Sequence, residues 1–223
     1  ATFLDLCCGS GNFIIRALEV GFKPENVFGY DTDPIAVEIT KKRIFLKTGY
    51  ISNNIQNANF LEKSALQKNN NGIIFDYIYT NPPWGKKIVK EEKERYGFIF
   101  QSGRSLDSCS LFFFACLRCL HKDGELGLLL PDSFFNIGAF EDARRKVLSL
   151  DVQRFVDYGK PFKGLMTKAF AFVLKNKECN EHSLVYSFAN NPKSIINFQC
   201  SAESIDVIQH VYEKPHINLA HRA

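Results

Sequence analysis

Residues 2–13, TFLDLCCGSGNF, join a short apolar strand, a glycine turn and the first turn of a helix. Gly9 and Gly11 let the backbone approach a ligand closely, and glycine adopts the positive φ that such a turn needs. A strand, a glycine turn and a helix in this order begin a nucleotide-binding βαβ unit. Asn12 and Phe13 stand where the dinucleotide fingerprint has its third glycine. The run predicts an α/β fold, with a bare turn as the alternative to a ligand site.

An acidic residue ends the next predicted strand. This strand covers residues 27–31 and ends in Asp31, about 20 residues after Gly11, the offset at which an acid accepts hydrogen bonds from a bound ribose. Asp31 could instead cap the following helix, but Asp33, directly before Pro34, fits that role better. We therefore predict that Asp31 faces a ribose and that Asp33 begins a helix over residues 35–46.

The stretch NPPW, residues 81–84, follows an apolar run over residues 73–80 that is typical of a buried strand. It places Asn81, Pro82, Pro83 and Trp84 at the carboxyl end of a strand, where open α/β sheets bind their ligands. Proline donates no backbone N–H, so these carbonyls stay free to accept hydrogen bonds. An amide oxygen, a proline carbonyl and a flat ring suit a planar guest with an exocyclic amine. An ordinary turn with a packed tryptophan is the alternative.

Strands alternate with helices along most of the chain. This order favours an α/β fold with a doubly wound, mostly parallel seven-stranded sheet and helices on both faces. The last two strands lie close together, so we expect one of them to be antiparallel. The strands are predicted near residues 2–5, 27–31, 55–59, 73–80, 125–130, 153–157 and 169–175.

The pattern weakens after about residue 178, where a further helix could cover residues 204–212. We therefore divide the chain into one domain over residues 1–178 and a C-terminal extension or connector over residues 179–223. The chain begins at Ala1, already inside a strand, so we expect it to be a fragment of a longer protein.

Composition indicates an ordinary globular domain. The chain has 223 residues, of which 45% are hydrophobic and 23% charged, and no apolar run approaches the length of a membrane span. Seven cysteines, an odd number, favour free thiols in a reducing compartment, so we expect a cytoplasmic protein. Cys116 and Cys119 could form a redox or zinc pair. We favour two buried small side chains on one helix and expect no metal, because no second ligand pair has the spacing of a metal site.

The net charge of +4 does not by itself indicate a nucleic-acid ligand. A charge run over residues 86–95 follows NPPW directly, and such a run is usually a solvated face or loop. Its first members, Lys86 and Lys87, lie close enough to the predicted pocket to contact phosphate. We expect the residues Arg144, Arg145 and Lys146, on a predicted helix, to face solvent.

Two of these stretches together resemble a known family. Residues 4–13, LDLCCGSGNF, resemble the S-adenosylmethionine motif of amino-group DNA methyltransferases, and NPPW resembles their catalytic motif. Their order is that of the gamma-type adenine-N6 enzymes of bacterial restriction-modification systems. Residues 124–135, GELGLLLPDSFF, and 169–175, AFAFVLK, are similar to later parts of the same family. The resemblance covers residues 1–178 and implies a Rossmann-like class I methyltransferase fold.

The resemblance also implies roles for individual residues. The cofactor S-adenosyl-L-methionine would contact Asp5, Cys7, Gly9, Gly11, Asn12, Asp31 and Asn59. Catalysis would fall to Asn81, Pro82 and Trp84, and the substrate would contact Pro83, Trp84, Phe162, Lys86 and Lys87. The substrate would be double-stranded DNA with its target adenine flipped out, because a base inside a duplex cannot reach such a site. Asn59 stands where the family often has aspartate, and Trp84 where it more often has tyrosine or phenylalanine.

Three functions fit these motifs. The first is DNA adenine-N6 methylation in a restriction-modification system, with a recognition or nuclease region elsewhere in the full-length chain. The second is methylation of an rRNA or tRNA base or of a protein glutamine, because the same amide, proline and aromatic groups would serve there. The third is an inactive module that binds S-adenosylmethionine. The presence of Asp5, Asp31 and Asn81 argues against the third.

Overall fold

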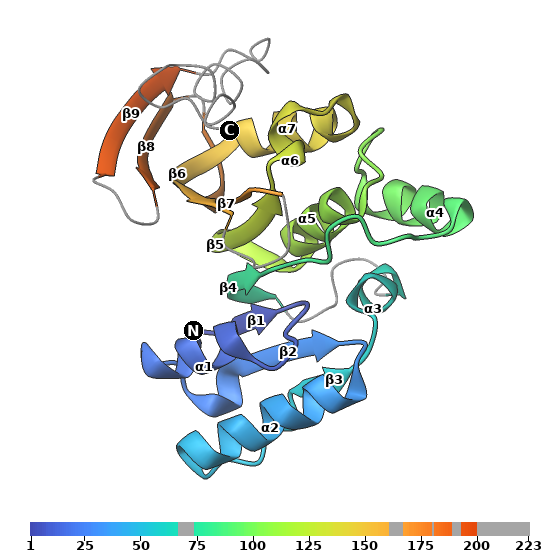
Figure 1. Cartoon of the computed structure of the whole chain (residues 1–223), viewed down its shortest axis with the longest axis vertical. Coiled ribbons are helices and arrows are strands. Elements are labelled where there is room, and N and C mark those ends of the chain that lie inside the picture. The colour runs from blue at the N-terminus through green and yellow to red at the C-terminus, as the bar shows by residue number, and fades with distance from the viewer. Residues whose placement is uncertain (67–73, 161–166, 180, 189–192, 200–223) are drawn as a thin grey trace.

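A nine-stranded sheet runs through the computed structural model, which describes residues 1–66, 74–160, 167–179, 181–188 and 193–199 (Figure 1). The strand order is β3-β2-β1-β4-β5-β7-β6-β8-β9. The strands are β1 (Phe3–Asp5), β2 (Val27–Asp31), β3 (Ile55–Asn57), β4 (Phe75–Thr80), β5 (Leu120–Pro131), β6 (Leu150–Gly159), β7 (Ala169–Glu178), β8 (Glu181–Phe188) and β9 (Lys193–Gln199).

Helices connect the strands from β1 to β6. Pro34 begins the longest helix of the described part, with Asp33 as its N-cap and Gly49 after its last turn. The helices are α1 (Asn12–Glu19), α2 (Pro34–Thr48), α3 (Phe60–Leu66), α4 (Lys90–Phe100), α5 (Ser108–Cys119), α6 (Ser133–Asn136) and α7 (Glu141–Leu148), with the short 3₁₀ helices η1 (Pro24–Asn26) and η2 (Gly138–Phe140).

The seven predicted strands are confirmed as β1 to β7, and their pairing is mostly parallel. β1 pairs in parallel with β2 and β4, β2 with β3, and β4 with β5. The predicted antiparallel strand is β7, which lies between β5 and β6 and runs against both. β8 and β9 were not predicted; they extend the same sheet beyond β6. The division at residue 178 stays a prediction, and the predicted helix over residues 204–212 lies outside the described residues.

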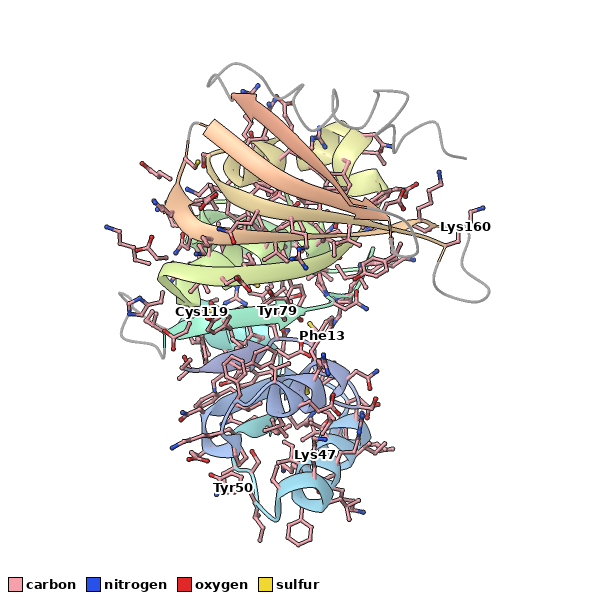
Figure 2. All side chains as sticks on the ribbon, turned by 90° about the vertical axis from the view of Figure 1, so that its left-hand side faces the viewer. Phe13, Lys47, Tyr50, Tyr79, Cys119 and Lys160 are labelled. Atoms are coloured by element: carbon pink, nitrogen blue, oxygen red, sulfur yellow. The ribbon has the colours of Figure 1, made fainter. Side chains whose placement is uncertain are left out.

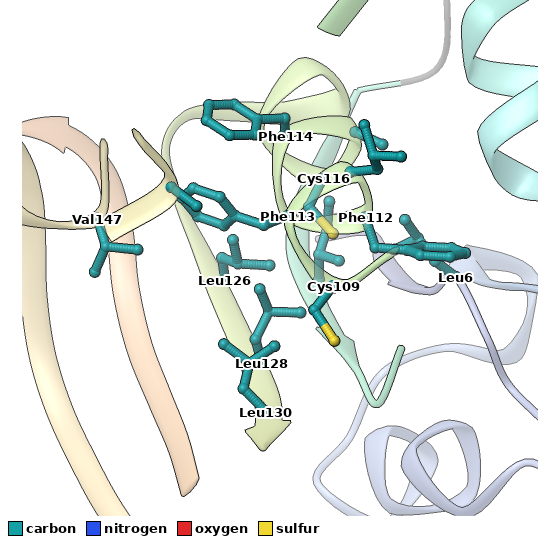
Figure 3. Packing of buried hydrophobic residues seen from close by; sticks show 14 of the residues in the cluster. Leu6, Cys109, Phe112, Phe113, Phe114, Cys116, Leu126, Leu128, Leu130 and Val147 are labelled. Atoms are coloured by element: carbon teal, nitrogen blue, oxygen red, sulfur yellow. The ribbon is translucent and has the colours of Figure 1, made fainter. Parts of the chain in front are cut away.

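Helices cover both faces of the sheet, as predicted, and bury a separate apolar cluster on each. Leu4 of β1 joins the larger cluster, together with residues of α3 to α7, whereas its neighbour Phe3 joins the smaller one, together with α1 and α2. Figure 2 looks onto the side that carries α1, with Phe13 and Tyr79 labelled. Figure 3 shows α5 against β5 in the larger cluster, with Phe113 beside Leu126. Successive strand residues point to opposite faces, so this division follows from the alternation within each strand.

The prediction for Arg144 was wrong. Its side chain is buried on α7, and its Nη1 donates hydrogen bonds to the carbonyl oxygens of Phe134 (2.8 Å) and Ile137 (2.7 Å). These carbonyls lie at and just after the end of α6, where helix carbonyls run out of partners within the helix, and the Ile137 carbonyl also accepts from the Phe140 N–H (3.1 Å). Burial lowers the pKa of the guanidinium. Arg145 does face solvent and pairs with Glu141 (3.0 Å).

Candidate active site

The two sequence motifs meet at one cavity. It has a volume of about 520 Å³ and lies at the carboxyl ends of β1 to β4, where parallel sheets bind ligands. Such a volume is in the range of small-molecule and cofactor sites. The cavity is lined by Leu6, Cys7, Asp31, Thr32, Ala58, Asn59, Phe60, Asn81, Pro82, Pro83, Trp84, Lys86 and Phe112.

Residues 5–12, which we name the glycine loop, are held by hydrogen bonds from β2 and α2. The Gly9 N–H donates to Oδ2 of Asp31 (2.7 Å), and Thr40 Oγ1 donates back to the Gly9 carbonyl (2.8 Å). Arg43 Nη1 donates to the Ser10 carbonyl and to Asn12 Oδ1. At Gly11 φ is +86°, and a Cβ would come within 2.8 Å of the Thr40 side chain. Both the turn and the approach of α2 therefore require glycine at this position.

Asp31 faces the cavity from the end of β2. Its Oδ2 accepts from Gly9, and its Oδ1 accepts from the Asp33 N–H (2.9 Å). A carboxylate has about four acceptor positions, so capacity for a ligand's hydroxyls remains. The capping role predicted for Asp33 is confirmed, because its Oδ1 accepts from the Ile35 N–H (2.8 Å).

Asp5 lies behind the cavity wall rather than on it. The side chain is 1% exposed, and its Oδ1 accepts hydrogen bonds from Thr80 Oγ1 (2.7 Å) and from the Cys7 N–H (3.1 Å). Desolvation by burial raises the pKa of this carboxyl to about 7. Because Thr80 ends β4, Asp5 connects the glycine loop to the second motif.

Residues 80–86, which we name the proline loop, are anchored by side chains at several points. Besides the bond from Thr80 to Asp5, Trp84 Nε1 donates to the Leu129 carbonyl on β5 (3.2 Å). Ser108, the first residue of α5, donates from Oγ to the Pro83 carbonyl (2.8 Å). Gly85 has φ of +64°, a conformation that favours glycine.

Among the side chains of the cavity lining, Asn81 carries the one nitrogen or oxygen atom that is buried without a partner. Its Oδ1 has no hydrogen-bond partner among the residues that the structure describes. The great majority of buried polar side-chain atoms in proteins do have one. An amide oxygen left in this state beside a cavity is suited to accept a hydrogen bond from a ligand.

Trp84 is half-buried and has two surroundings. It packs against the larger apolar cluster and also lines the cavity.

Asn59 lines the cavity too, and its Oδ1 accepts from the Leu61 N–H (3.1 Å) at the start of α3. Because that oxygen is engaged, the amide group of Asn59 offers a donor to a ligand.

Not every predicted site residue lines the cavity. The residues away from the lining are Asp5, Gly9, Gly11, Asn12 and Lys87, and Phe162 lies outside the described residues. The lining includes five residues that the sequence did not single out: Leu6, Thr32, Ala58, Phe60 and Phe112. Four of them adjoin a predicted strand end, a signal that could have found them. Phe112 comes from α5 and points toward Leu6 (Figure 3), and its place in an apolar helix gave no such signal.

Cys116 and Cys119 are both buried, as predicted, and neither forms a disulfide. Burial raises the pKa of the Cys119 thiol to about 12, so it stays protonated at neutral pH. Across the described part of the chain, no group of three or more His, Cys, Asp or Glu side chains is placed to hold a metal ion. Nor does any helix within the described ranges have the length and apolar character needed to cross a membrane.

Comparison with known sequences identifies a family. The model of the Eco57I restriction-modification methylase family matches residues 25–163. The chain is similar to the type II methyltransferase M.VspI from Vibrio sp. (strain 343), with 40% identity over 98% of the chain. It spans 56% of that relative's length.

Solved structures share the fold at lower identity. The methyltransferase subunit of the type I restriction-modification system from Streptococcus thermophilus has a TM-score of 0.67 and 18% identity, over 96% of this chain and 47% of that one. The structure of DrdV in complex with DNA has a TM-score of 0.63 and 14% identity, over 86% of this chain and 24% of that one. Together with the family match, these likenesses show a methyltransferase-type fold of restriction-modification proteins. The chain belongs to the Eco57I restriction-modification methylase family.

Proposed function

We propose that this chain carries the methyl-transfer centre of a DNA adenine-N6 methyltransferase in a restriction-modification system. The observation that carries the proposal is the unpartnered Asn81 Oδ1 beside a cavity that also receives Asp31. Family membership and the similarity to a type II methyltransferase support the reaction class. A structural relative that binds DNA supports DNA as the substrate.

The part of the cavity over β1 to β3 fits S-adenosylmethionine. Asp31 offers carboxylate oxygens for ribose hydroxyls, and Asn59 offers an amide donor for the adenine ring. Leu6, Ala58 and Phe60 provide apolar walls, the lining that cofactor sites generally have. When bound, this cofactor supplies a methyl group on a cationic sulfonium, which is a good leaving group.

The proline loop would prepare the nucleophile. An exocyclic amine of adenine has its lone pair delocalised into the ring. Asn81 Oδ1 and the Pro82 carbonyl would each accept a hydrogen bond from one N–H of the amine. These two bonds would localise the nitrogen lone pair toward the methyl group. These acceptors are fixed before the reaction, so little reorganisation is needed during it. Holding the amine in line with the methyl group supplies a further part of the rate.

Trp84 and Lys86 would hold the flipped nucleotide. A base stacked on an aromatic ring gains roughly 1–3 kcal/mol, and Trp84 lines the cavity next to Asn81. Lys86 is exposed and lines the same cavity, where its ammonium can contact a phosphate. Lys87 is exposed as well but lies outside the lining, so its contact with DNA would be weaker.

The remaining assignments of the sequence also belong to this proposal. Phe162 would cover the second face of the base, and Gly9, Gly11 and Asn12 would shape the cofactor turn. Recognition of a DNA sequence, and any nuclease, would come from other parts of a longer polypeptide in the cytoplasm. The chain spans only about half of M.VspI, which leaves room for such parts in relatives of that length.

The test is transfer of a labelled methyl group by the complete natural polypeptide that contains this chain. Labelled S-adenosylmethionine is offered with DNA, RNA and protein pools, and the modified group is identified by mass spectrometry. We expect N6-methyladenine in DNA, and none with the Asn81→Ala variant. Label in RNA or in glutamine would assign one of the other substrates, and cofactor binding without transfer to any pool would indicate an inactive module.

A further inference from the structure

Ser108 is buried beneath the proline loop and makes two hydrogen bonds to it. Its Oγ donates to the Pro83 carbonyl (2.8 Å) and accepts from the Lys86 N–H (3.2 Å). The side chain is fully buried, at 0% exposure. One hydroxyl thus uses its donor and one acceptor position to close the turn over residues 83–86.

The first turn of α5 holds Ser108 rigidly. Asp107 is the N-cap of this helix and accepts from the Cys109 N–H (2.8 Å), which fixes where the helix begins. Eight buried residues of the helix belong to the larger apolar cluster, so the helix cannot shift without disturbing the core. A hydroxyl on such a support holds the loop in one geometry.

The hydrogen bond from Ser108 to Pro83 also makes the two proline carbonyls different in their availability to a ligand. The Pro83 carbonyl is occupied by Ser108, which leaves the Pro82 carbonyl for a ligand amine. Proline fixes φ at both positions, which limits how residues 81–84 can rearrange independently of one another. A loosened Pro83 would therefore displace Asn81, the residue with the unpartnered amide oxygen.

We propose that Ser108 is a positioning residue that sets which two acceptors of the proline loop face the substrate amine. This inference rests on the proposed function and adds to it a residue on α5 that contacts neither substrate nor cofactor. Ser108 acts through Pro83 and Lys86. Its loss should lower the rate of the chemical step and leave cofactor affinity unchanged.

Ser110 gives a matched control on the same helix. It is also fully buried, and its Oγ has no hydrogen-bond partner within the described residues. Replacement of either serine by alanine removes one buried hydroxyl from α5. The two variants differ in whether that hydroxyl holds the proline loop.

The experiment compares Ser108→Ala and Ser110→Ala in the complete polypeptide by kcat, by the Kd for S-adenosylmethionine and by hydrogen exchange. We expect Ser108→Ala to lower kcat by about 10- to 100-fold, the range for a small misplacement of reacting groups. Its Kd for the cofactor should stay within about twofold, because the cofactor part of the cavity is untouched. The Lys86 amide should exchange faster in this variant, since it loses its acceptor. Ser110→Ala should match wild type in all three measurements.

Equal kcat and equal Lys86 exchange in the two alanine variants would overturn the inference. If Ser108→Ala does not fold, Ser108→Cys keeps nearly the same volume with a much weaker donor, and kcat unchanged from wild type in that variant would overturn it too. Failure of the proposed function looks different, because wild type would then transfer no methyl group to adenine. Exchange at Lys86 would in that case still decide whether Ser108 holds the loop.

Discussion

The glycine loop and the proline loop lie at the same edge of the sheet but differ in whether their polar groups already have hydrogen-bond partners. In the glycine loop, backbone groups of Gly9 and Ser10 are already paired with Asp31, Thr40 and Arg43. In the proline loop, Thr80, Pro83 and Trp84 are anchored, yet Asn81 Oδ1 is left without a partner among the described residues. The first loop is built to keep a shape, and the second to present an acceptor.

Asn81→Ala should cause the largest loss of kcat, because it removes the free acceptor that distinguishes the proline loop from the glycine loop. It removes the acceptor, so kcat should fall by about 10²–10³-fold, the size seen when one fixed group of an oxyanion hole is removed. The Kd for S-adenosylmethionine should change less than about twofold, because the glycine loop is unaffected. Steady-state kinetics and calorimetry measure the two quantities.

Asn59→Ala is the matched control for Asn81, because both amides line the same cavity. Asn59→Ala should weaken cofactor binding more than it lowers kcat. An Asn81→Ala variant that loses cofactor affinity and kcat equally would mean that Asn81 is structural.

Asp31→Ala tests the glycine loop side of the comparison. Removal of hydrogen bonds to a charged group costs about 1.5–3 kcal/mol, so the Kd for S-adenosylmethionine should rise by roughly 10- to 100-fold. kcat at saturating cofactor should change much less. Asp33→Ala is the control: it removes the N-cap of α2, away from the cavity lining, and should cost about 1 kcal/mol of stability with little change in Kd. Calorimetry that finds the two variants equal in Kd would remove the ribose role from Asp31.

Local signals explain how much of this site the sequence could predict. The glycine turn, Asp31 and NPPW are contiguous or regularly spaced, and both loops were placed correctly at strand ends. The bonds that hold them were not predictable, because Thr80 lies 75 residues from Asp5 and Ser108 lies 25 residues from Pro83. A buried hydroxyl leaves no periodic pattern.

The errors elsewhere have a similar cause. Charge alone suggested solvent for Arg144, whereas the end of α6 supplies carbonyls that pair its guanidinium. The sequence of β8 over residues 182–188, HSLVYSF, does have apolar residues at alternate positions. No flanking helix, however, marked it as part of the sheet. Strand pairing with β6 is a tertiary contact that the local pattern does not contain.

Asp5→Asn examines the bond that joins the two loops. The pKa of Asp5 is raised from 3.8 to about 7, so the folded state binds this proton more tightly than the unfolded state. The contribution of Asp5 to stability is therefore full below pH 4 and is lost as the pH rises toward and through 7. Wild type should lose about 1 kcal/mol from this group between pH 6 and pH 8.

Asparagine keeps an oxygen that can accept from Thr80 and Cys7 but does not titrate. The variant should therefore lack this part of the pH dependence while remaining folded. Denaturant unfolding at several pH values measures the difference. Parallel pH profiles for the two proteins would show that Asp5 is ionised in the folded protein across this range.

Lys86→Ala should have the smallest effect, a modest loss of DNA affinity. It tests whether the proline loop contacts DNA at the rim of the cavity. Lys86 is exposed and lines the cavity, whereas its neighbour Lys87 does not line it. If Lys86 contacts one phosphate, its loss should weaken DNA binding a few-fold at low salt and reduce the slope of log K against log salt by about 1, equally for all DNA sequences. Lys87→Ala should leave a steeper slope than Lys86→Ala when both are titrated by fluorescence anisotropy. Equal slopes would mean that Lys86 at the cavity rim does not contact the phosphate backbone of DNA. DNA would then be held by parts of the polypeptide away from the proline loop.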